Sequence, residues 1–436
     1  MLISASSIIV VLTALIAGGI FLFNRRLNTS SSWRALITPL ASIMGSGFLV
    51  CAPLLYASIG NYAVFAMAGL LCLAYAIGGV IRFNIRYGEA LFEKENVSTS
   101  DGREEHRLHV CHRNVACSVI VLEVTTFLEK SSHFVLAGAY CISVSYYLQL
   151  LASFGLQSLS ISHAWYGKAL VTVILTVIGI IGTVRGLKGI ERLERTVVGI
   201  NLAMIAALIT GLIYHNYEIF SHGTWGLHHI SIPMDKLYIV RTLMGILIIV
   251  QGFETSRFLG SEHSKEERIA TMRWAQLISA AIYILFISVM AVVINNAGSS
   301  HGEGITAIIG LSKIVSPVLP ILLTITAIGS QLSASTADDA GCSGLLEAIL
   351  KGGKISRINY AIVSVAAIIL TWLTDVYGII SYASRAFAFY YALQCVIAIL
   401  VLRKVSSVSL PKIKSILFGV LAGLCALITL FGIPAG

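Results

Sequence analysis

Long apolar segments alternate with short polar ones along the whole chain. A helix needs roughly 20 apolar residues to cross a hydrocarbon core about 30 Å thick, and segments of that length recur from one end of the chain to the other. We therefore predict an all-α polytopic membrane protein with about twelve transmembrane helices. The expected helices span residues 3–23, 35–58, 61–83, 131–155, 166–185, 194–214, 237–258, 271–295, 315–342, 358–376, 378–402 and 413–433.

The distribution of basic residues supports this number of helices. When the 30 Lys+Arg residues are assigned to alternating sides of the membrane, nearly all of them fall in the loops of one side. Cytoplasmic loops are enriched in Lys and Arg, so both termini are predicted to lie outside. The net charge of +9 then reflects orientation, and no nucleic-acid partner is expected. The compact loops indicate the inner (cytoplasmic) membrane of a bacterium.

The composition leaves little room for a soluble catalytic domain. The chain is 57% hydrophobic and 12% charged, against a charged fraction of about 25% in soluble domains. The longest polar interval, about residues 93–130, is too short for an independent domain. The sequence contains no nucleotide-binding glycine loop, zinc-peptidase helix or serine elbow, so we expect neither an enzyme nor a resident cofactor.

Histidine and cysteine residues gather in that polar interval. Zinc accepts nitrogen and sulfur ligands of this kind, but their spacing matches no familiar metal site. An amphipathic cytoplasmic segment is therefore the preferred interpretation. The residues are His106, His109, Cys111, His112 and Cys117.

Two apolar segments are interrupted by glycine at corresponding positions of the chain. With the first and last helices set aside, "IMGSGFLV" lies in the first of ten core helices and "IIVQGFETSRFLG" lies in the sixth. Five is an odd number, so the two segments cross in opposite directions, which predicts a five-plus-five inverted repeat with discontinuous first and sixth core helices. Such breaks point to a transporter site near the bilayer midplane, because freed backbone groups find no partner in hydrocarbon. The alternative is that the glycines permit close helix packing.

This repeat divides the chain into four parts. Residues 1–32 hold an extra transmembrane helix and a short loop, 33–215 the first repeat, 216–403 the second repeat, and 404–436 a second extra helix. The two extra helices lie outside the predicted symmetry.

Three short motifs resemble those of a known family. "GSGF" in the first core helix, "QGFETSRFLG" in the sixth and "RGLKGIERLER" between the fourth and fifth are similar to the amino acid–polyamine–organocation (APC) superfamily of transporters with the leucine-transporter fold, over about residues 33–403. The resemblance implies that the first break holds a solute carboxylate opposite Phe253. The family often places an aromatic residue of the third core helix, here Tyr146 or Tyr147, over the site, although membrane aromatics more commonly serve packing. The predicted solute-binding residues are Gly45, Ser46, Gly47, Phe48, Tyr146, Gln251, Gly252, Phe253, Glu254 and Thr255.

The eighth core helix is unusually polar and suits a cation. Its hydroxyl groups, in "GSQLSASTADD", are hard oxygen donors, which hard cations prefer. In sodium-coupled members of the family, hydroxyl residues of this helix meet carbonyl groups before the first break. The resemblance therefore implies a sodium site formed by Ser335 and Thr336 with the carbonyls of Ala41 and Met44, and with Ser333 as a substitute. The alternative is hydrogen bonding between helices.

A lysine of the fifth core helix occupies the sodium position in some proton-coupled members of the family. Alignment on "GLKGIERLERTVVGIN" places Asn201 there. The proton-type feature is therefore absent, and the sodium-type hydroxyl cluster remains.

Ionisable residues occur within the predicted helices, where charge is costly and side chains face the protein interior. Arg385 needs a partner, for which Asp338 or Asp339 is the first candidate and Glu254 the second. Such a pair is either a gate that breaks during transport or a static bridge. Asp375 lies near the outer end of its helix, where water is available.

These features predict a secondary active transporter that works by alternating access. We expect a cation-coupled symporter, driven by sodium, of a small polar organic solute such as an amino acid. The alternatives are a proton-coupled or exchange carrier that uses Glu254 or Asp338, and a membrane sensor or partner subunit that does not transport.

Overall fold

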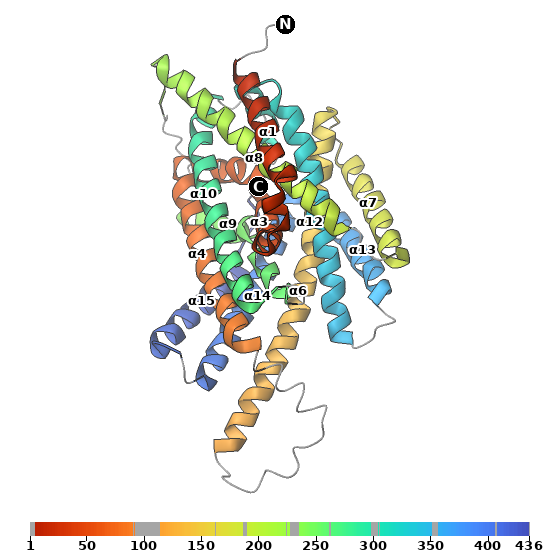
Figure 1. Ribbon diagram of the computed structural model, residues 1–436, viewed down its shortest axis with the longest axis vertical. Coiled ribbons are helices and arrows are strands. Elements are labelled where there is room, and N and C mark those ends of the chain that lie inside the picture. Colours follow the sequence, from red (N-terminus) through yellow and green to blue (C-terminus); the bar gives the residue numbers. More distant parts are fainter. Residues whose placement is uncertain are drawn as a thin grey trace.

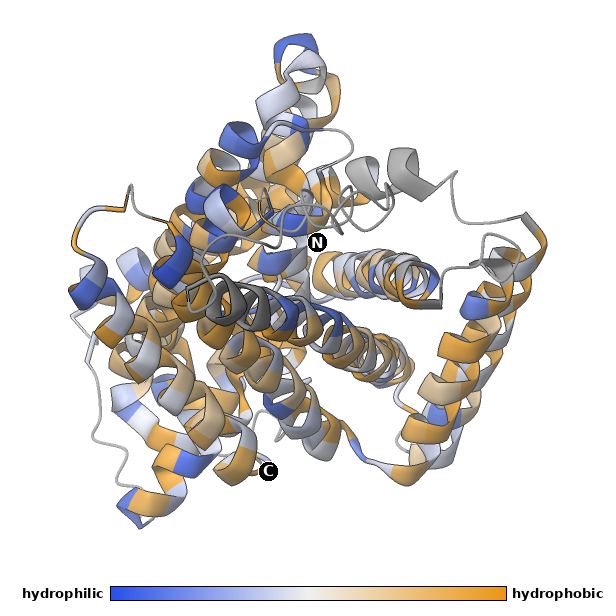
Figure 2. Cartoon of the chain, turned by 90° about the horizontal axis from the view of Figure 1, so that it is seen from below, coloured by the Kyte–Doolittle hydropathy of each residue, from blue (hydrophilic) through white to orange (hydrophobic). Residues whose placement is uncertain are grey.

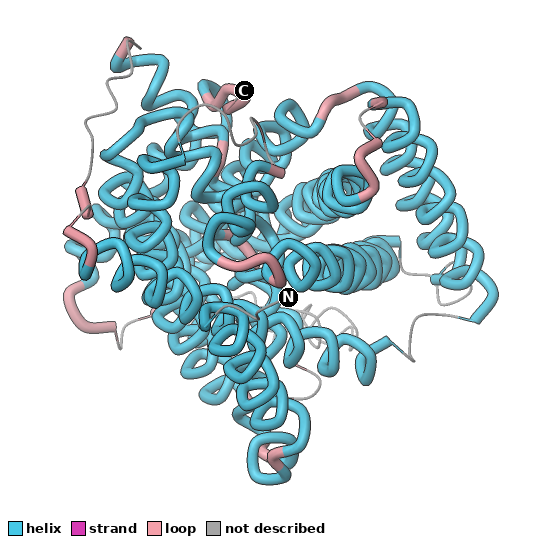
Figure 3. The backbone as a smooth tube through the Cα atoms, turned by 90° about the horizontal axis from the view of Figure 1, so that it is seen from above, coloured by secondary structure: helices cyan, strands magenta, loops and turns pink. Residues whose placement is uncertain are grey.

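The structure is a computed structural model in which helices make up nearly all of the described chain and no strand is present there (Figure 3). It describes residues 5–435 except for 90, 92–113, 162, 186–189, 224, 227–234, 261–262, 298–303, 305, 351–355 and 406–407. The predicted histidine and cysteine cluster lies outside the described residues, apart from the backbone of Cys117.

The helices follow the order of the predicted apolar segments (Figure 1). Nine of those in the described chain are long and apolar enough to cross a membrane, with α3, α4 and the short helices beside them counted as one stretch. Hydrophobic residues recur along most of these helices (Figure 2). The helices are α1 (Ala5–Phe23), α2 (Arg25–Thr29), α3 (Ser31–Ile59), η1 (Gly60–Tyr62), α4 (Ala63–Phe83), η2 (Asn84–Gly88), α6 (Asn114–Ser158), α7 (Ala164–Arg185), α8 (Ile190–Ser221), α9 (Lys236–Gly245), η4 (Leu247–Val250), η5 (Phe253–Phe258), α10 (Lys265–Ala297), α11 (Ala307–Val315), α12 (Leu319–Leu350), α13 (Ser356–Leu373), α14 (Val376–Lys404) and α15 (Pro411–Phe431).

The core helices pack in two groups. In the first group α3 and α4 pack against α10, and in the second α6 packs against α12 and α7 against α13. Figure 1 shows α7 and α13 side by side, and the N-terminal part of the long helix α6 projecting beyond the rest of the bundle. The two extra helices attach to the sides, α1 on α8 and α15 on α14.

The sixth core helix is broken, as predicted. Helix α9 ends at Gly245, and the short helix η4 that follows it ends at Val250. Gln251 is extended, Gly252 is left-handed, and η5 begins at Phe253. Gly252 has φ of +115°, a conformation that costs residues with a Cβ atom roughly 1–2 kcal/mol. The break therefore depends on glycine.

Side chains satisfy the backbone groups that the break exposes. The Gly252 N–H donates to Glu254 Oε2 over 3.0 Å, and Thr255 Oγ1 donates to the Gly252 carbonyl over 2.7 Å. The Ile248 N–H donates to Ser384 Oγ of α14 over 2.9 Å. An unsatisfied backbone group in the membrane interior costs several kcal/mol, so these contacts make an irregular backbone tolerable there.

The first core helix is continuous, and the prediction of a break at Gly45–Gly47 was wrong. Helix α3 runs through this stretch and through Pro39 and Pro53. A Cβ atom on Gly47 would lie 2.9 Å from Ile249 Cα, and one on Gly45 would lie 3.5 Å from Ala334 Cβ. Gly47 therefore serves close packing against η4, as the alternative interpretation held.

Replacing Gly252 by alanine should destabilise the fold. The new Cβ atom would lie 2.5 Å from Ser42 Oγ and 2.7 Å from the Ile43 nitrogen, and the left-handed backbone adds its own cost. We expect Gly252→Ala to lose about 2 kcal/mol or more, measured as a lower melting temperature of the purified protein in detergent.

The matched control is Gly419→Ala on α15, where a Cβ atom meets nothing within 4 Å. It should melt as the unmodified protein does or slightly higher, because alanine favours helix. Equal melting of the two variants would contradict a role of Gly252 in the break.

Candidate functional site

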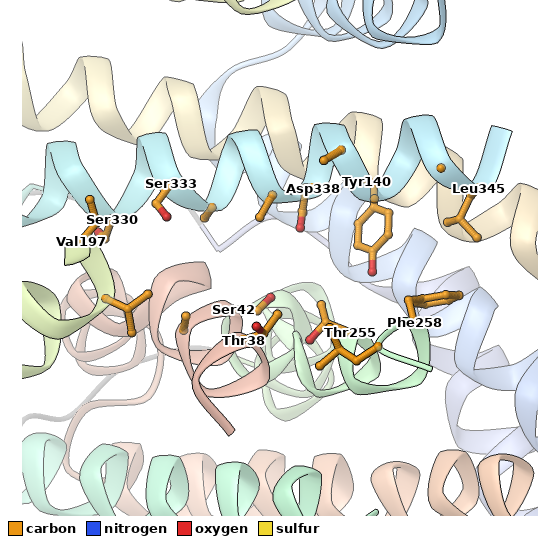
Figure 4. Close-up of a pocket in the computed structure, with 18 of the residues that line it drawn as sticks. Thr38, Ser42, Tyr140, Val197, Thr255, Phe258, Ser330, Ser333, Asp338 and Leu345 are labelled. Atoms are coloured by element: carbon orange, nitrogen blue, oxygen red, sulfur yellow. The ribbon is translucent and has the colours of Figure 1, made fainter. Parts of the chain in front are cut away.

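A cavity of about 530 Å³ lies between α3, α6, α8, α12 and the chain that follows the break. Helix α12 lines one wall with residues that recur every three or four positions, among them Ser330, Ser333, Ala337 and Gly341. Figure 4 shows this helix facing Thr38 and Ser42 of α3 and Thr255 of η5 across the cavity. The remaining lining residues are Ala41, His133, Tyr140, Val197, Val198, Asn201, Phe258, Leu259, Ala334, Asp338, Ala340, Gly344 and Leu345.

Among the described residues of this lining, Asp338 is the one carboxylate, and no lysine or arginine accompanies it there. Its side chain points from α12 into the cavity (Figure 4). Ser143 Oγ of α6 donates a hydrogen bond to Asp338 Oδ2. The other lining residues are apolar or carry hydroxyl or amide groups, except for the imidazole of His133. The cavity therefore presents a negative charge in mostly uncharged surroundings.

Two more carboxyl groups lie close to the cavity and are buried. Glu254 is fully buried, and its Oε2 accepts hydrogen bonds from the Gly252 N–H and from the Tyr391 hydroxyl, at 3.0 and 2.8 Å. Asp339 is 1% exposed, and neither carboxyl oxygen has a hydrogen-bond partner in the described structure. The central part of the protein thus holds three carboxyl groups.

The basic side chains nearest these groups in the described structure are Arg257 of η5 and His133 of α6, and both lie against Glu129, at 2.5 and 3.2 Å. The central stretches of the surrounding helices contain no Asp, Glu, Lys, Arg or His: residues 35–59 of α3, 134–158 of α6, 196–213 of α8 and 358–373 of α13. Buried charges are stable when paired, so the positive charge that balances the centre has to come from a proton, an ion or a solute.

Most of the predicted solute-binding residues pack in the protein interior instead of lining the cavity. Of the members whose side chains the structure describes, Thr255 alone lines it, and the side chain of Ser46 lies outside the described residues. Phe48 packs on Phe286 with ring centroids 4.4 Å apart, and Phe253 stacks on Tyr391 at 5.3 Å. Other members of the set lie on the buried face between α3, α6 and the break: Gly45, whose carbonyl accepts from Gln331 Nε2 over 3.0 Å, Tyr146, which is fully buried, and Gln251, whose Nε2 donates to the Tyr147 hydroxyl over 3.0 Å.

The predicted sodium ligands are divided between different faces. Ser333 and Ala41 line the cavity, whereas Met44 is buried and lies outside the lining. The hydroxyl groups of Ser335 and Thr336 donate to carbonyl groups of their own helix over 2.9 to 3.1 Å, and neither residue lines the cavity. In the described part of the chain, no group of three or more His, Cys, Asp or Glu residues is placed to hold a metal ion.

The expected pair of Arg385 with a carboxylate is not formed in this structure. Arg385 Nε donates to the Thr429 carbonyl in the last turn of α15 over 2.7 Å. Carbonyl groups at a helix C-terminus lack partners within the helix and carry partial negative charge, so they are suitable acceptors. Arg385 thus anchors α15 to α14, as a static bridge would, although its partner is a carbonyl.

A buried ion pair that the sequence did not indicate links the broken helix to two others. Arg257 is 6% exposed and bonds Glu129 Oε1 of α6 over 2.5 Å. It also donates to Gln394 Oε1 of α14, and the Gln394 amide donates to Ser132 Oγ over 2.9 Å. The feature of the sequence that could have indicated this network is the glutamine within the apolar run "YYALQCVIA", because a polar side chain at that depth is costly unless it has partners. The network fixes the end of η5 against α6 and α14.

Removing one member of this ion pair should destabilise the protein strongly. Glu129→Gln leaves the Arg257 charge buried without its counterion, and such changes cost about 3–5 kcal/mol. Chemical denaturation or thermal melting measures the loss. Glu266→Gln, which neutralises an exposed carboxylate at the start of α10, should change stability by no more than about 0.5 kcal/mol. If the two variants were equally stable, the ion pair would contribute nothing to the fold.

Comparisons with known proteins match this chain to a family of transporters. The family model of APC superfamily transporters matches residues 25–432. An uncharacterized protein from Aquifex aeolicus (strain VF5) is 38% identical over 424 residues, which is 97% of this chain and 96% of the relative.

Solved structures of transporters are similar to this one at low sequence identity. The manganese transporter of Eremococcus coleocola, solved as a single-residue mutant, shares the fold with a TM-score of 0.56 and 10% identity over 93% of this chain and 87% of its own. A Na+-coupled sialic acid symporter aligns with a TM-score of 0.49 and 12% identity over 98% and 97% of the two chains.

Proposed function

Because this chain belongs to the APC superfamily of transporters, we propose that it carries a small organic solute with a positively charged nitrogen, such as an amino acid, together with a coupling cation. The observation that supports this proposal is the charge balance at the centre. Asp338 faces the cavity, the described lining contains no lysine or arginine, and the nearby Arg257 is paired with Glu129. A solute that brings a positive charge supplies what the site lacks.

The cavity suits an organic ammonium group better than a bare metal ion. Asp338 offers a carboxylate for the ammonium group, and charge-assisted hydrogen bonds of this kind are strong. Ser42, Thr255 and Asn201 supply polar contacts, while alanine, valine and leucine side chains cover the apolar part of a solute. The manganese of the structural relative is not carried over, because the described residues offer no group of three metal-binding side chains.

We infer that the cavity opens toward the cytoplasm. Thr38 lies one helical turn after Arg34, and the lining segment around Thr255 and Phe258 flanks Arg257. Leu345, at the same end of the cavity, precedes the basic loop at 351–357. These basic residues belong to the loops that the charge distribution assigns to the inside. The structure would then represent the inward-facing stage of alternating access.

For the coupling ion, the carboxyl groups favour a proton over sodium. The hydroxyl groups of Ser335 and Thr336, which were expected to hold sodium, are engaged with carbonyl groups of their own helix. Ser333 and the segment around Ala41 keep a sodium site as the second candidate, since both line the cavity. No feature of the described cavity favours the alternative that the protein is a membrane sensor that does not transport.

Neutralising Asp338 should weaken solute binding. The protein is screened by thermal shift against the twenty standard amino acids, putrescine and choline, each in sodium chloride and in potassium chloride, since ligand binding raises the melting temperature by mass action. A hydrogen bond to a charged group contributes about 1.5–3 kcal/mol. We therefore expect Asp338→Asn to bind the identified solute roughly ten to a hundred times more weakly.

Glu347→Gln is the matched control, because it neutralises a carboxylate on the same helix outside the cavity lining. It should bind as the unmodified protein does. A shift that requires sodium would favour the sodium site. Unchanged affinity in Asp338→Asn would contradict the proposed binding site, and the absence of a shift with any of these compounds would contradict transport of an ammonium-bearing solute.

A further inference from the structure

We propose that Asp339 is a proton-binding site that controls whether the cavity is open, and that its proton is the coupling ion of transport. The second half of this proposal rests on the proposed function, whereas the first half depends only on the geometry of Asp339. Asp339 follows the cavity residue Asp338 on α12, yet it does not line the cavity.

The surroundings of Asp339 accept only a neutral carboxyl group. Its side chain is 1% exposed, and neither oxygen has a hydrogen-bond partner in the described structure. By contrast, Asp338 lies at the cavity and accepts a hydrogen bond from Ser143. An ionised carboxylate without water or a partner carries a penalty of several kcal/mol. In this conformation Asp339 is therefore the uncharged acid.

The groups around Asp339 offer no positive charge that would change this conclusion. The titratable groups beside it are the thiols of Cys141 on α6 and Cys342 on α12, which lie 3.6 Å from each other, and the carboxyl group of Asp338. The central stretches of α3, α8 and α13, which also pack against α12, contain no Asp, Glu, Lys, Arg or His, and the further neighbour α11 carries Lys313, whose side chain is exposed. A proton is thus the cation that fits this position.

The consequence is a link between protonation and conformation. The open cavity is compatible with protonated Asp339, whereas ionised Asp339 favours any conformation that brings water or a hydrogen-bond donor to it. A ligand shifts an equilibrium toward the state that binds it better, and here the ligand is a proton. Lower pH therefore favours the open cavity and higher pH disfavours it.

The first half is tested by labelling a cavity position at different pH values. Ser333→Cys lines the cavity, and its modification by a membrane-impermeant maleimide is quantified by mass spectrometry of the peptide that contains it. Labelling of the denatured protein at each pH corrects for the reactivity of the thiol. We expect the corrected labelling of Ser333→Cys to rise severalfold as the pH falls, because the open cavity is then favoured.

In the Asp339→Asn background, the side chain is neutral at every pH. The corrected labelling should then be high and independent of pH, and Asp339→Leu should behave in the same way if the asparagine variant does not fold. Glu347→Gln should keep the pH dependence of Ser333→Cys alone. The proposal would be overturned if the pH dependence of labelling persisted in both Asp339 variants. It would also be overturned if Ser333→Cys with Asp339 unchanged showed no pH dependence.

The second half is tested in vesicles with an imposed pH gradient and a mixture of the twenty standard amino acids. Uptake driven by the gradient should occur with the unmodified protein and with Glu347→Gln, and should be lost in Asp339→Asn, while exchange of labelled for unlabelled amino acid persists. Gradient-driven uptake by Asp339→Asn would overturn the role of its proton. No uptake or exchange by the unmodified protein would instead contradict the proposed function, and the labelling result would stand by itself.

Discussion

The constraint on which the structure depends is the break in the sixth core helix at Gln251–Gly252. A continuous membrane helix pairs its own backbone N–H and C=O groups, and a break leaves some of them without hydrogen-bond partners. Other parts of the molecule therefore have to supply those partners. Glu254, Thr255 and Ser384 do so at the break itself. The Tyr283 hydroxyl of α10 lies 3.0 Å from the Ile43 carbonyl and 2.7 Å from the Ile249 carbonyl. The break thereby holds α3, α10 and α14 together around the segment that faces the cavity.

The same break explains where the charges lie. Glu254 accepts hydrogen bonds from the Gly252 N–H and from the Tyr391 hydroxyl, so it stabilises the break in addition to any role in transport. Asp338 points into the cavity, and Asp339 points away from it. Adjacent residues of an α-helix are about 100° apart around its axis, which is enough to place Asp338 at the cavity and to leave Asp339 outside its lining. In the account proposed above, the two groups bind different ligands: Asp338 an ammonium group and Asp339 a proton.

Hydrophobic length was sufficient to predict the order of the helices, because the bilayer imposes a minimum apolar length on every crossing segment. The break at Gly252 was also predictable, since glycine and a glutamate occur together there. The continuity of α3 was not, because Gly45 and Gly47 serve close packing as well as they would serve a break. Only the position of Ile249, which nearly touches Gly47, decides between the two.

The composition of the site was harder to predict than its place. The polar residues of α12 occur on all its faces, and which face meets the cavity depends on neighbours that lie far away in the sequence. Asp338 was singled out as an ionisable residue, but in the structure Ser143 donates a hydrogen bond to it, and its expected partner Arg385 bonds the Thr429 carbonyl. The ion pair between Arg257 and Glu129 joins residues on different helices, and no local sequence pattern predicts an ion pair between residues so far apart in the chain.

The central claim is that Asp338 receives the positive charge of the solute. The most direct measurement is an electron cryomicroscopy structure of the protein in a lipid nanodisc with the solute that the thermal-shift screen identifies. The account predicts density for the solute in the cavity between α3, η5 and α12, with its nitrogen within hydrogen-bond distance of the Asp338 carboxylate. Density for the solute at another position, or a solute whose uncharged or acidic end meets Asp338, would contradict it.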